Sequence, residues 1–449
     1  MSNECPQILE VLEQVVEQNC YSADDIMQTA NDIKLCLGKL DSTNKEFSIS
    51  PEELFGRHCA VLGSTGGGKS WSLARIIEES CKFKCKVILF DASGEFETLD
   101  QGVTHLCVGQ SQNHKEKSVS VPYYHLRESD LFAIFKPSGP SQGPKFRAAI
   151  QSLKLARLSP ILSVDGTIIK AHKSKIDFER ERSRHGQKLG SPYNEFEIRF
   201  LPQQIQNECV EPQRSSTENT TWGGHSNLDL SYCVSLVNRV QDMISSPNLA
   251  AIFKPKGLPS LFEEINRFTV DSEARVLRIS LKYLPFEYNT REIIGNAIGR
   301  YLLEMARRSR FCDNPHIVIL DEAHQFLTKT LRDENENFPL DAFGLIAKEG
   351  RKYALNIVLS TQRPRDIPED VLSQVGFFLI HRLTNDHDLK VIERASGTIN
   401  KESMELVPRL EPGQSVAVGV SIDGAIKIKM HAPVNGPESN GPNYQDYWR

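Results

Sequence analysis

Two segments of the chain carry residue types that suit phosphate chemistry. Residues 63–70 read Gly-Ser-Thr-Gly-Gly-Gly-Lys-Ser, which fits the pattern G-x-x-x-x-G-K-[ST] between an apolar run and a helical pattern. Glycines let successive backbone N–H groups point inward around phosphate oxygens, and the N-terminus of the following helix adds a positive dipole. The sequence therefore predicts a phosphate-binding loop whose cradle consists of Gly63, Ser64, Thr65, Gly66, Gly67, Gly68, Lys69, Ser70 and Trp71.

The second segment supplies the carboxylates that such a loop needs. The apolar run at 316–320 is followed directly by Asp321 and Glu322, and an open α/β sheet holds its ligands at the carboxyl ends of its strands. We expect Lys69 to contact the β- and γ-phosphates, Ser70 to ligate Mg²⁺, and Asp321 to hold the same ion, generally through its water. Glu322 is then placed to activate the attacking water. The two segments together predict hydrolysis of ATP with Mg²⁺ as cofactor.

The elements that must position these residues form a regular pattern. Short β-branched runs alternate with helical patterns from residue 54 onward, which is typical of an α/β fold with a central, mostly parallel sheet. The predicted strands are 58–62, 86–90, 274–281, 316–320, 355–359 and 377–380, with a closing hairpin at 415–420 and 425–430. We expect the helix that follows the phosphate-binding loop to cover residues 71–80.

The domain organisation follows from changes in this pattern. Residues 51–432 are expected to form the nucleotide-binding core. A mostly helical insertion is expected at about 109–272, where helical patterns at 143–157 and 229–245 are joined by segments rich in Ser, Gly, Pro and Asn. The apolar spacing within residues 6–39 predicts a short helical N-terminal extension over residues 1–50. Residues 433–449 are expected to form a flexible tail.

Composition excludes several classes of protein. The chain has 449 residues, of which 39% are hydrophobic and 25% charged, as in soluble globular proteins. Without an apolar run of about 18 residues or a signal-peptide layout, the chain is expected to be cytoplasmic, with no membrane partner. The ten cysteines form no C-x-x-C pair, which favours free thiols over metal ligation. The net charge of −5 argues against coating nucleic acid over the whole surface and leaves a basic pore open.

Residues 321–324 spell Asp-Glu-Ala-His, the motif of a large class of helicases. Those helicases have two tandem lobes and place the motif much nearer to the phosphate-binding loop. No later glutamine-and-arginine motif of a second lobe follows in this chain. This alternative is therefore disfavoured, and it would require stimulation by single-stranded nucleic acid.

Four further motifs complete a recognisable set: Asp-Ala-Ser-Gly-Glu-Phe at 91–96, Gly-Arg-Lys-Tyr at 350–353, Ser-Thr-Gln-Arg-Pro at 360–364 and Arg-Leu-Thr-Asn at 382–385. With the phosphate-binding loop and the Asp-Glu pair, in this order, the set resembles the HerA/FtsK superfamily, specifically its HerA type, over about residues 54–432. The resemblance implies a RecA-like P-loop NTPase core, assembly into a homo-hexameric ring, and translocation or helicase activity on double-stranded DNA.

The same resemblance implies roles for further side chains. Gln362 would sense the γ-phosphate and couple hydrolysis to movement, and Arg57 would lie near the nucleotide. Because ring motors bind ATP between subunits, an arginine of the neighbouring subunit should reach the γ-phosphate. The candidates for that arginine or lysine are Lys348, Arg351, Lys352 and Arg382. The sequence does not choose among them, and Arg351 is included among the catalytic candidates. In 91–96, the acidic residues either orient water or metal or cap the following turn.

DNA contact is left open by the sequence. The basic stretch 170–188 contains interspersed acidic residues, which favours a solvated helix face, and loops after 344–353 are equally good pore elements. Members of the family usually begin with a small β-barrel that docks a nuclease, whereas the residues before the core have a helical pattern here; either the barrel is missing and partner docking has moved, or short strands have been misread as helix. The expected partner is a nuclease or a sirtuin-like effector, in anti-phage defence or DNA end processing. The alternative is a ring scaffold that controls an effector without translocation, and salt-sensitive stimulation of the ATPase by DNA separates the two.

Overall fold

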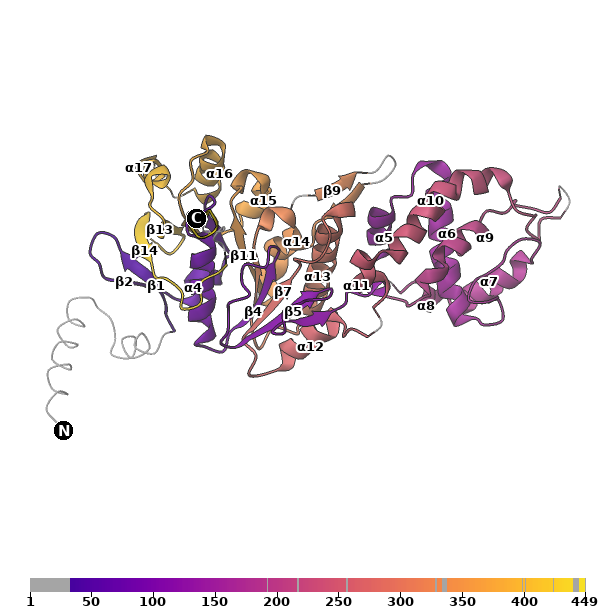
Figure 1. Ribbon diagram of the computed structural model, residues 1–449, viewed down its shortest axis with the longest axis horizontal. Helices are drawn as coiled ribbons and strands as arrows, with labels where there is room; N and C mark the ends of the chain where they lie inside the picture. Colours follow the sequence, from indigo (N-terminus) through magenta and orange to yellow (C-terminus); the bar gives the residue numbers. More distant parts are fainter. Residues whose placement is uncertain are drawn as a thin grey trace.

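A 12-stranded sheet forms the centre of the molecule (Figure 1). The computed structural model describes residues 33–448 apart from 192, 216–217, 256, 328, 333–336, 398, 400, 423 and 439–443. The strand order is β2-β1-β14-β13-β12-β3-β11-β8-β4-β7-β5-β6. From β12 to β6 all neighbours run parallel: β12 (Phe377–Ile380), β3 (Cys59–Leu62), β11 (Leu355–Thr361), β8 (His316–Leu320), β4 (Lys86–Asp91), β7 (Val276–Ser280), β5 (Val103–Val108) and β6 (Lys117–Val119). The predicted α/β class with a mostly parallel sheet is confirmed.

The central strands are apolar throughout because both of their faces are covered. Alternate residues of β3 enter different cores: Ala60 and Leu62 belong to one apolar cluster, whereas Cys59 and Val61 belong to another. The first cluster is closed by α13 (Thr290–Arg307) and α14 (Ala342–Glu349), and the second by α4 (Lys69–Cys81). The sheet therefore lies between helices: α13 and α14 cover one face, and α4 covers the other.

Four antiparallel strands extend the sheet beyond β12. They are β13 (Gln414–Gly419), β14 (Ile426–Met430), β1 (Leu35–Leu40) and β2 (Glu46–Ile49). The predicted hairpin at 415–430 is thus present, but the predicted helix over residues 35–39 is wrong. Leu35, Leu37, Phe47 and Ile49 are buried with the period of two that a strand requires. The first part of the predicted helical extension, residues 1–32, lies outside the described residues.

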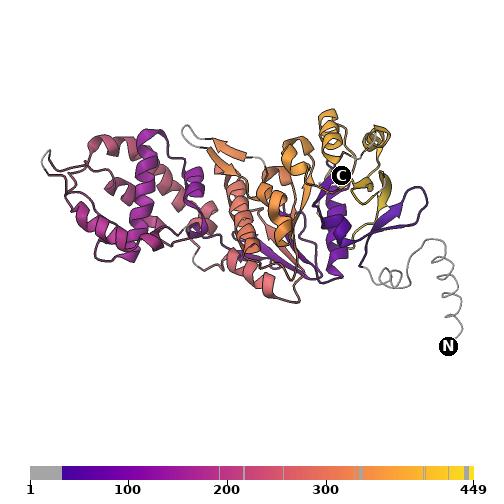
Figure 2. The same cartoon turned by 180° about the vertical axis from the view of Figure 1, so that it is seen from behind.

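A helical lobe occupies the end of the molecule opposite β1 and β2, as both views show (Figures 1 and 2). It consists of α5 (Glu128–Phe135), α6 (Gly139–Leu158), α7 (Lys175–Arg184), α8 (Gly186–Leu189), α9 (Leu201–Asn207), α10 (Asn227–Ser245) and α11 (Ala250–Phe253). The helical patterns at 143–157 and 229–245 lie within α6 and α10. The lobe is followed by α12 (Leu261–Val270), which lies beside the sheet. Strand β6 lies inside the region that was expected to be mostly helical. The sequence did not reveal this strand, because three residues are too few to show a period of two.

The remaining elements are short. They are α3 (Pro51–Phe55), β9 (Lys329–Arg332), β10 (Asn337–Leu340), α15 (Glu369–Leu372), α16 (Asp386–Ser396), α17 (Lys401–Leu406) and α18 (Tyr444–Tyr447). Among the described residues, no helix is both long and apolar enough to cross a membrane.

The start of the expected flexible tail is held against the core. The N–H groups of Val434 and Asn435 both donate to the carboxylate of Glu78 on α4, at 2.9 and 2.8 Å. Thr98 donates to the carbonyl oxygen of Gly436 at 2.8 Å. These hydrogen bonds correct the expectation of a loose tail for residues 434–436, because its polar backbone finds partners on α4 and beside it.

Candidate active site

The phosphate-binding loop connects β3 to α4 and is shaped by its glycines. Gly66 and Gly68 have φ values of 75° and 105°, in the region that only glycine adopts without strain. The N–H of Gly67 donates to the carbonyl oxygen of Ser64 at 3.0 Å. Ser64 in turn donates its N–H and its hydroxyl to the carbonyl oxygen of Arg382, at 2.9 and 2.8 Å. The segment that follows β12 therefore fixes the first turn of the loop.

His381 packs against the phosphate-binding loop. This role of His381 was not predicted from the sequence. A Cβ atom added to Gly63 would lie 2.6 Å from the Cβ of His381, so this position needs glycine for close packing. The His381 ring is fully buried, and its Nδ1 lies 2.9 Å from the carbonyl oxygen of Gln414. Burial lowers the pKa of His381 to about 4, so the ring is neutral at physiological pH. The sequence signal was only a histidine at the end of an apolar strand.

Lys69 lies between the two predicted carboxylates. Its Nζ is 3.4 Å from Asp321 Oδ1, 3.3 Å from Glu322 Oε1 and 3.3 Å from Ser360 Oγ. Burial disfavours the charged lysine, but the charges of Asp321 and Glu322 outweigh burial and raise its pKa. The lysine is therefore a permanent cation that the acidic residues hold in place at the base of the loop.

Asp321 is fitted to a cation. Burial raises its pKa to about 7, with the neighbouring Lys69 opposing that rise. Its Oδ1 accepts from Ser360 at 3.2 Å, whereas its buried Oδ2 has no hydrogen-bond partner among the described residues. Ser70 directly follows Lys69, whose ammonium contacts Asp321. A buried carboxylate oxygen without a partner and a serine hydroxyl are oxygen donors of the kind that Mg²⁺ prefers. The residues thus fit the predicted metal role.

Glu322 has an unusual backbone. Its φ and ψ are 51° and 50°, a left-handed conformation that costs a non-glycine residue of order 1 kcal/mol. Its Oε2 lies 3.3 Å from Nδ1 of His324, which is also 3.2 Å from the hydroxyl of Thr361. Burial lowers the pKa of His324, so its ring is neutral and does not add a charge beside Glu322. The turn after β8 directs the carboxylate of Glu322 toward Lys69.

Gln362 and Thr65 join the end of β11 to the phosphate-binding loop. The hydroxyl of Thr65 donates to Oε1 of Gln362 at 2.6 Å. An amide can also donate to phosphate and accept from water without adding charge. The predicted sensor residue is therefore in contact with the loop whose contents it would sense.

Of the two roles that the sequence left open for the segment 91–96, the structure shows the capping of the turn. Asp91 accepts from the N–H groups of Gly94, Glu95 and Phe96, so it caps the turn after β4. The turn brings Glu95 to Ser70, whose hydroxyl donates to Glu95 Oε2 at 2.9 Å. Glu95 is a site residue that sequence reasoning did not separate from its neighbours.

A buried arginine holds Asp91 from the other side. Arg278 on β7 is 0% exposed; its Nε lies 2.7 Å from Asp91 Oδ2 and its Nη1 lies 2.6 Å from Glu116 Oε1. Burial disfavours its charge, but Asp91 and Glu116 outweigh that effect and raise its pKa. The sequence contains one indication of this role, an arginine inside the apolar run at 274–281. This indication was missed.

The phosphate-binding loop borders a cavity of about 470 Å³, a size typical of small-ligand sites. It is lined by the predicted cradle, namely Ser64, Thr65, Gly66, Gly68, Lys69, Ser70 and Trp71, and by Glu95, Glu322, Gln362, Pro412, Gly413, Met430, His431 and Ala432. Gly63 and Gly67 instead approach His381. The structure thus brings together nearly all predicted nucleotide-binding residues, and the end of β14 closes one side of the cavity.

Two of the predicted arginines, Arg57 and Arg351, lie away from this cavity. Arg57 precedes β3, whereas the loop follows it, and six extended residues place them roughly 20 Å apart. Arg57 instead lines a second cavity, of about 590 Å³, with Lys348, Arg351 and Lys352. The expectation that Arg57 lies near the nucleotide of its own chain is therefore wrong. Arg57 lies before the start of β3, whereas the phosphate-binding loop follows the end of that strand. Arg382 is beside the phosphate-binding loop of its own chain.

The basic stretch 170–188 belongs to the helical lobe. Lys170 is buried and forms an ion pair with Glu208. On α7, the three arginines pair with acidic residues of the same helix, in the pairs Arg180 with Asp177, Arg182 with Glu179 and Arg184 with Glu181. The charges of this face are therefore largely balanced within the lobe, which gives no support to DNA contact by this stretch.

Comparison with known proteins agrees with this geometry. The family model "Helicase HerA, central domain" matches residues 35–190. The chain is 25% identical over 448 residues to a "Probable helicase MJECL08" of Methanocaldococcus jannaschii, covering 95% of this chain and 77% of that protein. It is 22% identical to the "DNA double-strand break repair helicase HerA" of Saccharolobus solfataricus, covering 89% of this chain and 69% of that protein.

Solved structures share the fold. VirB4 of Thermoanaerobacter pseudethanolicus superposes with a TM-score of 0.53 at 13% identity, over 89% of this chain and 96% of that one. The bacterial conjugative coupling protein TrwB superposes with a TM-score of 0.50 at 11% identity, over 88% of this chain and 89% of that one. The similarity extends over most of the chain.

Proposed function

Since this chain is a HerA-type ATPase of the HerA/FtsK superfamily, we propose that it is a motor that uses ATP hydrolysis to move along double-stranded DNA. The observation that carries the proposal is the contact of Lys69 with both Asp321 and Glu322 at the cavity where Thr65 meets Gln362. A cation, two carboxylates and an amide at one phosphate-binding loop are the parts that hydrolysis and its coupling to movement require. Several relatives carry the name of DNA double-strand break repair helicases.

The proposed mechanism begins with Lys69. In the described arrangement its ammonium neutralises the carboxylates of Asp321 and Glu322. When ATP enters, phosphate oxygens compete for this cation, which leaves Glu322 to accept a proton from the attacking water. Ser70 and Asp321 would hold Mg²⁺, which would supply positive charge to the phosphate oxygens. Gln362, released from Thr65, would then register whether a γ-phosphate is present.

The ring is part of the proposal because no arginine is among the described residues that line the nucleotide cavity. Arg57 and Arg351 are exposed at the opposite edge of the sheet, on a cavity that opens to the surface. In a homo-hexameric ring this edge would face the nucleotide cavity of the next subunit. Arg351 would then complete that site in trans, an interaction that is worth at least about 10³-fold in rate in related nucleotide hydrolases.

The proposal extends to an effector that the motor serves, a nuclease or a sirtuin-like enzyme, in DNA end processing or anti-phage defence. Its support is that relatives of this chain are named as helicases of DNA double-strand break repair. The test is degradation of linear duplex DNA by a candidate nuclease mixed with this chain. Degradation that needs both the motor and ATP supports the pairing, and degradation that ignores the motor contradicts it.

The first experiment measures the ATPase rate with and without linear double-stranded DNA over a salt series, with the mass determined by light scattering. We expect a ring of about six subunits whose rate rises with duplex DNA, with stimulation that falls steeply as salt increases because phosphate contacts release counterions. Glu322→Gln should bind ATP and abolish hydrolysis. A rate that DNA does not change would contradict the motor and favour a scaffold whose assembly ATP controls.

The trans arginine has a separate test. Arg351→Ala retains an intact phosphate-binding loop, and Lys69→Ala retains an intact Arg351, so each ring alone should be inactive. Mixed rings contain interfaces with one wild-type Lys69 and one wild-type Arg351, and we expect hydrolysis to return in them. Arg184→Ala, on α7 of the lobe, is the matched control and should leave the rate unchanged. Mixed rings that stay inactive would contradict action in trans.

A further inference from the structure

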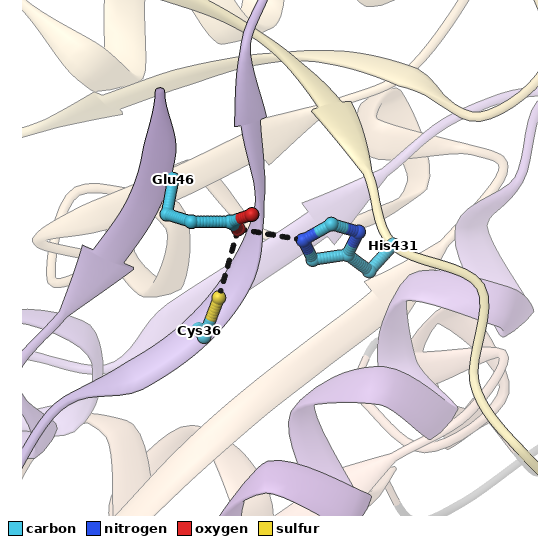
Figure 3. Close-up of side chains that lie close together, drawn as sticks. All are labelled: Cys36, Glu46 and His431. Carbon is cyan, nitrogen blue, oxygen red and sulfur yellow. Dashed lines mark hydrogen bonds and ion pairs between the residues drawn. The ribbon is translucent and has the colours of Figure 1, made fainter. Parts of the chain in front are cut away.

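Three side chains with different donor atoms meet at the antiparallel strands (Figure 3). Cys36 comes from β1, Glu46 from β2, and His431 directly follows β14. Oε2 of Glu46 lies 2.7 Å from Nε2 of His431 and accepts from the thiol of Cys36 at 3.2 Å. One ligand atom from each residue lies within 4.8 Å of the others. A sulfur, a nitrogen and an oxygen donor therefore converge on one small volume.

The backbone holds these donors in place. β1 pairs antiparallel with both β2 and β14, and a register shift between Cys36 and Gly38 marks a bulge beside the cluster. The N–H of His431 donates to the carbonyl oxygen of Leu37 at 2.9 Å. Bulges re-aim side chains at functional positions. The three donors thus sit on paired strands, which hold their relative positions better than a loop would.

Cys36 is also anchored to the helix that begins at the phosphate-binding loop. Its N–H donates to Glu79 at 3.2 Å, and its carbonyl oxygen accepts from Nη2 of Arg75 at 2.9 Å. Both partners lie on α4, and Arg75 and Glu79 are themselves ion-paired at 2.5 Å. The main chain at the cluster is therefore fixed from two directions, by the sheet and by α4.

We propose that Cys36, Glu46 and His431 form a binding site for a divalent transition-metal ion of the zinc class. Thiolate, imidazole and carboxylate are the ligands that Zn²⁺ takes, and three protein ligands leave the fourth tetrahedral position to water. Mg²⁺ does not suit this set, because it prefers oxygen ligands only. The site is therefore chemically distinct from the one formed by Ser70 and Asp321.

The charge balance of binding is simple. The carboxylate of Glu46 and a ring nitrogen of His431 would bind through lone pairs, and the thiol of Cys36 would lose its proton to solvent as the metal–sulfur bond forms. Burial, together with the neighbouring carboxylate of Glu46, raises the pKa of Cys36. Without metal the thiol therefore stays protonated and donates a hydrogen bond to Glu46. A cation would replace the protons that now hold the three groups together.

The position of the cluster links it to the nucleotide. His431 lines the 470 Å³ cavity together with Met430 and Ala432. The main chain of Cys36 is hydrogen-bonded to α4. A metal ion that fixes His431 would fix this wall of the cavity. We expect zinc-class ions to change the affinity of the cavity for ATP analogues, a consequence that rests on the proposed function while the metal site itself does not.

The test uses the full chain, freed of metal with a chelator, without nucleotide, and titrated with Co²⁺ as a spectroscopic probe. We expect a thiolate-to-cobalt charge-transfer band in the near ultraviolet that saturates at one ion per chain and is removed by added Zn²⁺. Cys36→Ser should abolish this band, and His431→Gln should weaken Co²⁺ binding about tenfold or more. Circular dichroism of each variant checks that the fold is kept.

Two control variants test whether the cobalt band comes from this cluster. Cys312→Ser removes an exposed cysteine distant in sequence from the cluster and should keep the band. Lys69→Ala removes ATP chemistry and should also keep it, so a failed motor and a failed metal site give different results. A band that survives Cys36→Ser, or a folded wild-type chain that shows none, would overturn the proposal and leave the cluster as a hydrogen-bonded group.

Discussion

Replacing Arg278 by methionine tests whether the buried charge network behind the site is essential to the fold. Arg278→Met keeps most of the apolar stem but removes the charge and all donors. Two carboxylates lose their partner, those of Asp91 and Glu116, whose side chains are 0% and 1% exposed. Asp91 keeps three backbone N–H donors, whereas Glu116 keeps the hydroxyl of Ser111. Most of the penalty should therefore come from Glu116.

The magnitude follows from burial. Removing one partner of a buried ion pair costs about 3–5 kcal/mol, because the remaining charge is left uncompensated. Since the turn at 94–96 still satisfies Asp91, we expect one such penalty for Arg278→Met rather than two. The matched control is Arg394→Met, whose ion pair with Glu369 is 75% exposed on both sides. Exposed pairs contribute about 0–1 kcal/mol, so the control should unfold almost like the wild type.

The assay is urea unfolding of nucleotide-free protein, followed by circular dichroism. We expect the midpoint of Arg278→Met to fall well below that of Arg394→Met. The double variant Arg278→Met with Glu116→Gln removes the stranded charge and should regain part of the lost free energy of unfolding. A stability of Arg278→Met within about 1 kcal/mol of the wild type, or a double variant that loses the sum of both single losses, would refute an essential role for the buried charges.

Three further predictions concern the site itself. Gln362→Ala should lower DNA-stimulated kcat by about 10²-fold with little change in ATP affinity, since it removes a group used in the transition state; an equal loss of affinity, measured by titration, would contradict this. Gly63→Ala should cost about 1–3 kcal/mol in urea unfolding, because its Cβ would meet His381 at 2.6 Å. Burial lowers the pKa of His381 and of His316 to about 4 from the unfolded value of 6.5. The unfolded chain therefore binds more protons between these values, and the free energy of unfolding should fall as pH drops from 6.5 to 4, by up to about 1.4 kcal/mol per pH unit for each ring. A Tm that stays flat over this window would contradict the assignment of neutral buried rings.

Much of the site could be predicted because its parts lie at the carboxyl ends of parallel strands. The apolar runs at 316–320 and 377–380 gave strands with the same bounds in the structure. Once these strands are parallel, Lys69, Asp321 and Gln362 must meet at one edge of the sheet. Local pattern and one topological rule were sufficient for this part.

The remainder depends on contacts that no local pattern contains. β1 was misread because its residues also fit a helical spacing, and its partner β14 lies at the far end of the sequence, with Gly38 opposite Met430. Arg57 is close to the phosphate-binding loop in sequence, but an extended strand separates them in space. Arg278 and His381 act through partners on other elements, so only the folded sheet identifies them.

The ends of the helical lobe are fastened to one another. The N–H of Ser120 donates to the carbonyl oxygen of Pro259 at 2.9 Å, that of Val121 to Ala251 at 3.0 Å, and that of Leu261 to Ser120 at 2.8 Å. The chain therefore leaves the sheet and returns to it at neighbouring points, and the length between them has only a weak effect on the cost of closing the loop. During evolution such a segment can be lengthened, trimmed or exchanged without altering the neighbours of β6 and β7. The same ATP-hydrolysing sheet could in this way acquire a different outer domain through a change at a single place in its gene.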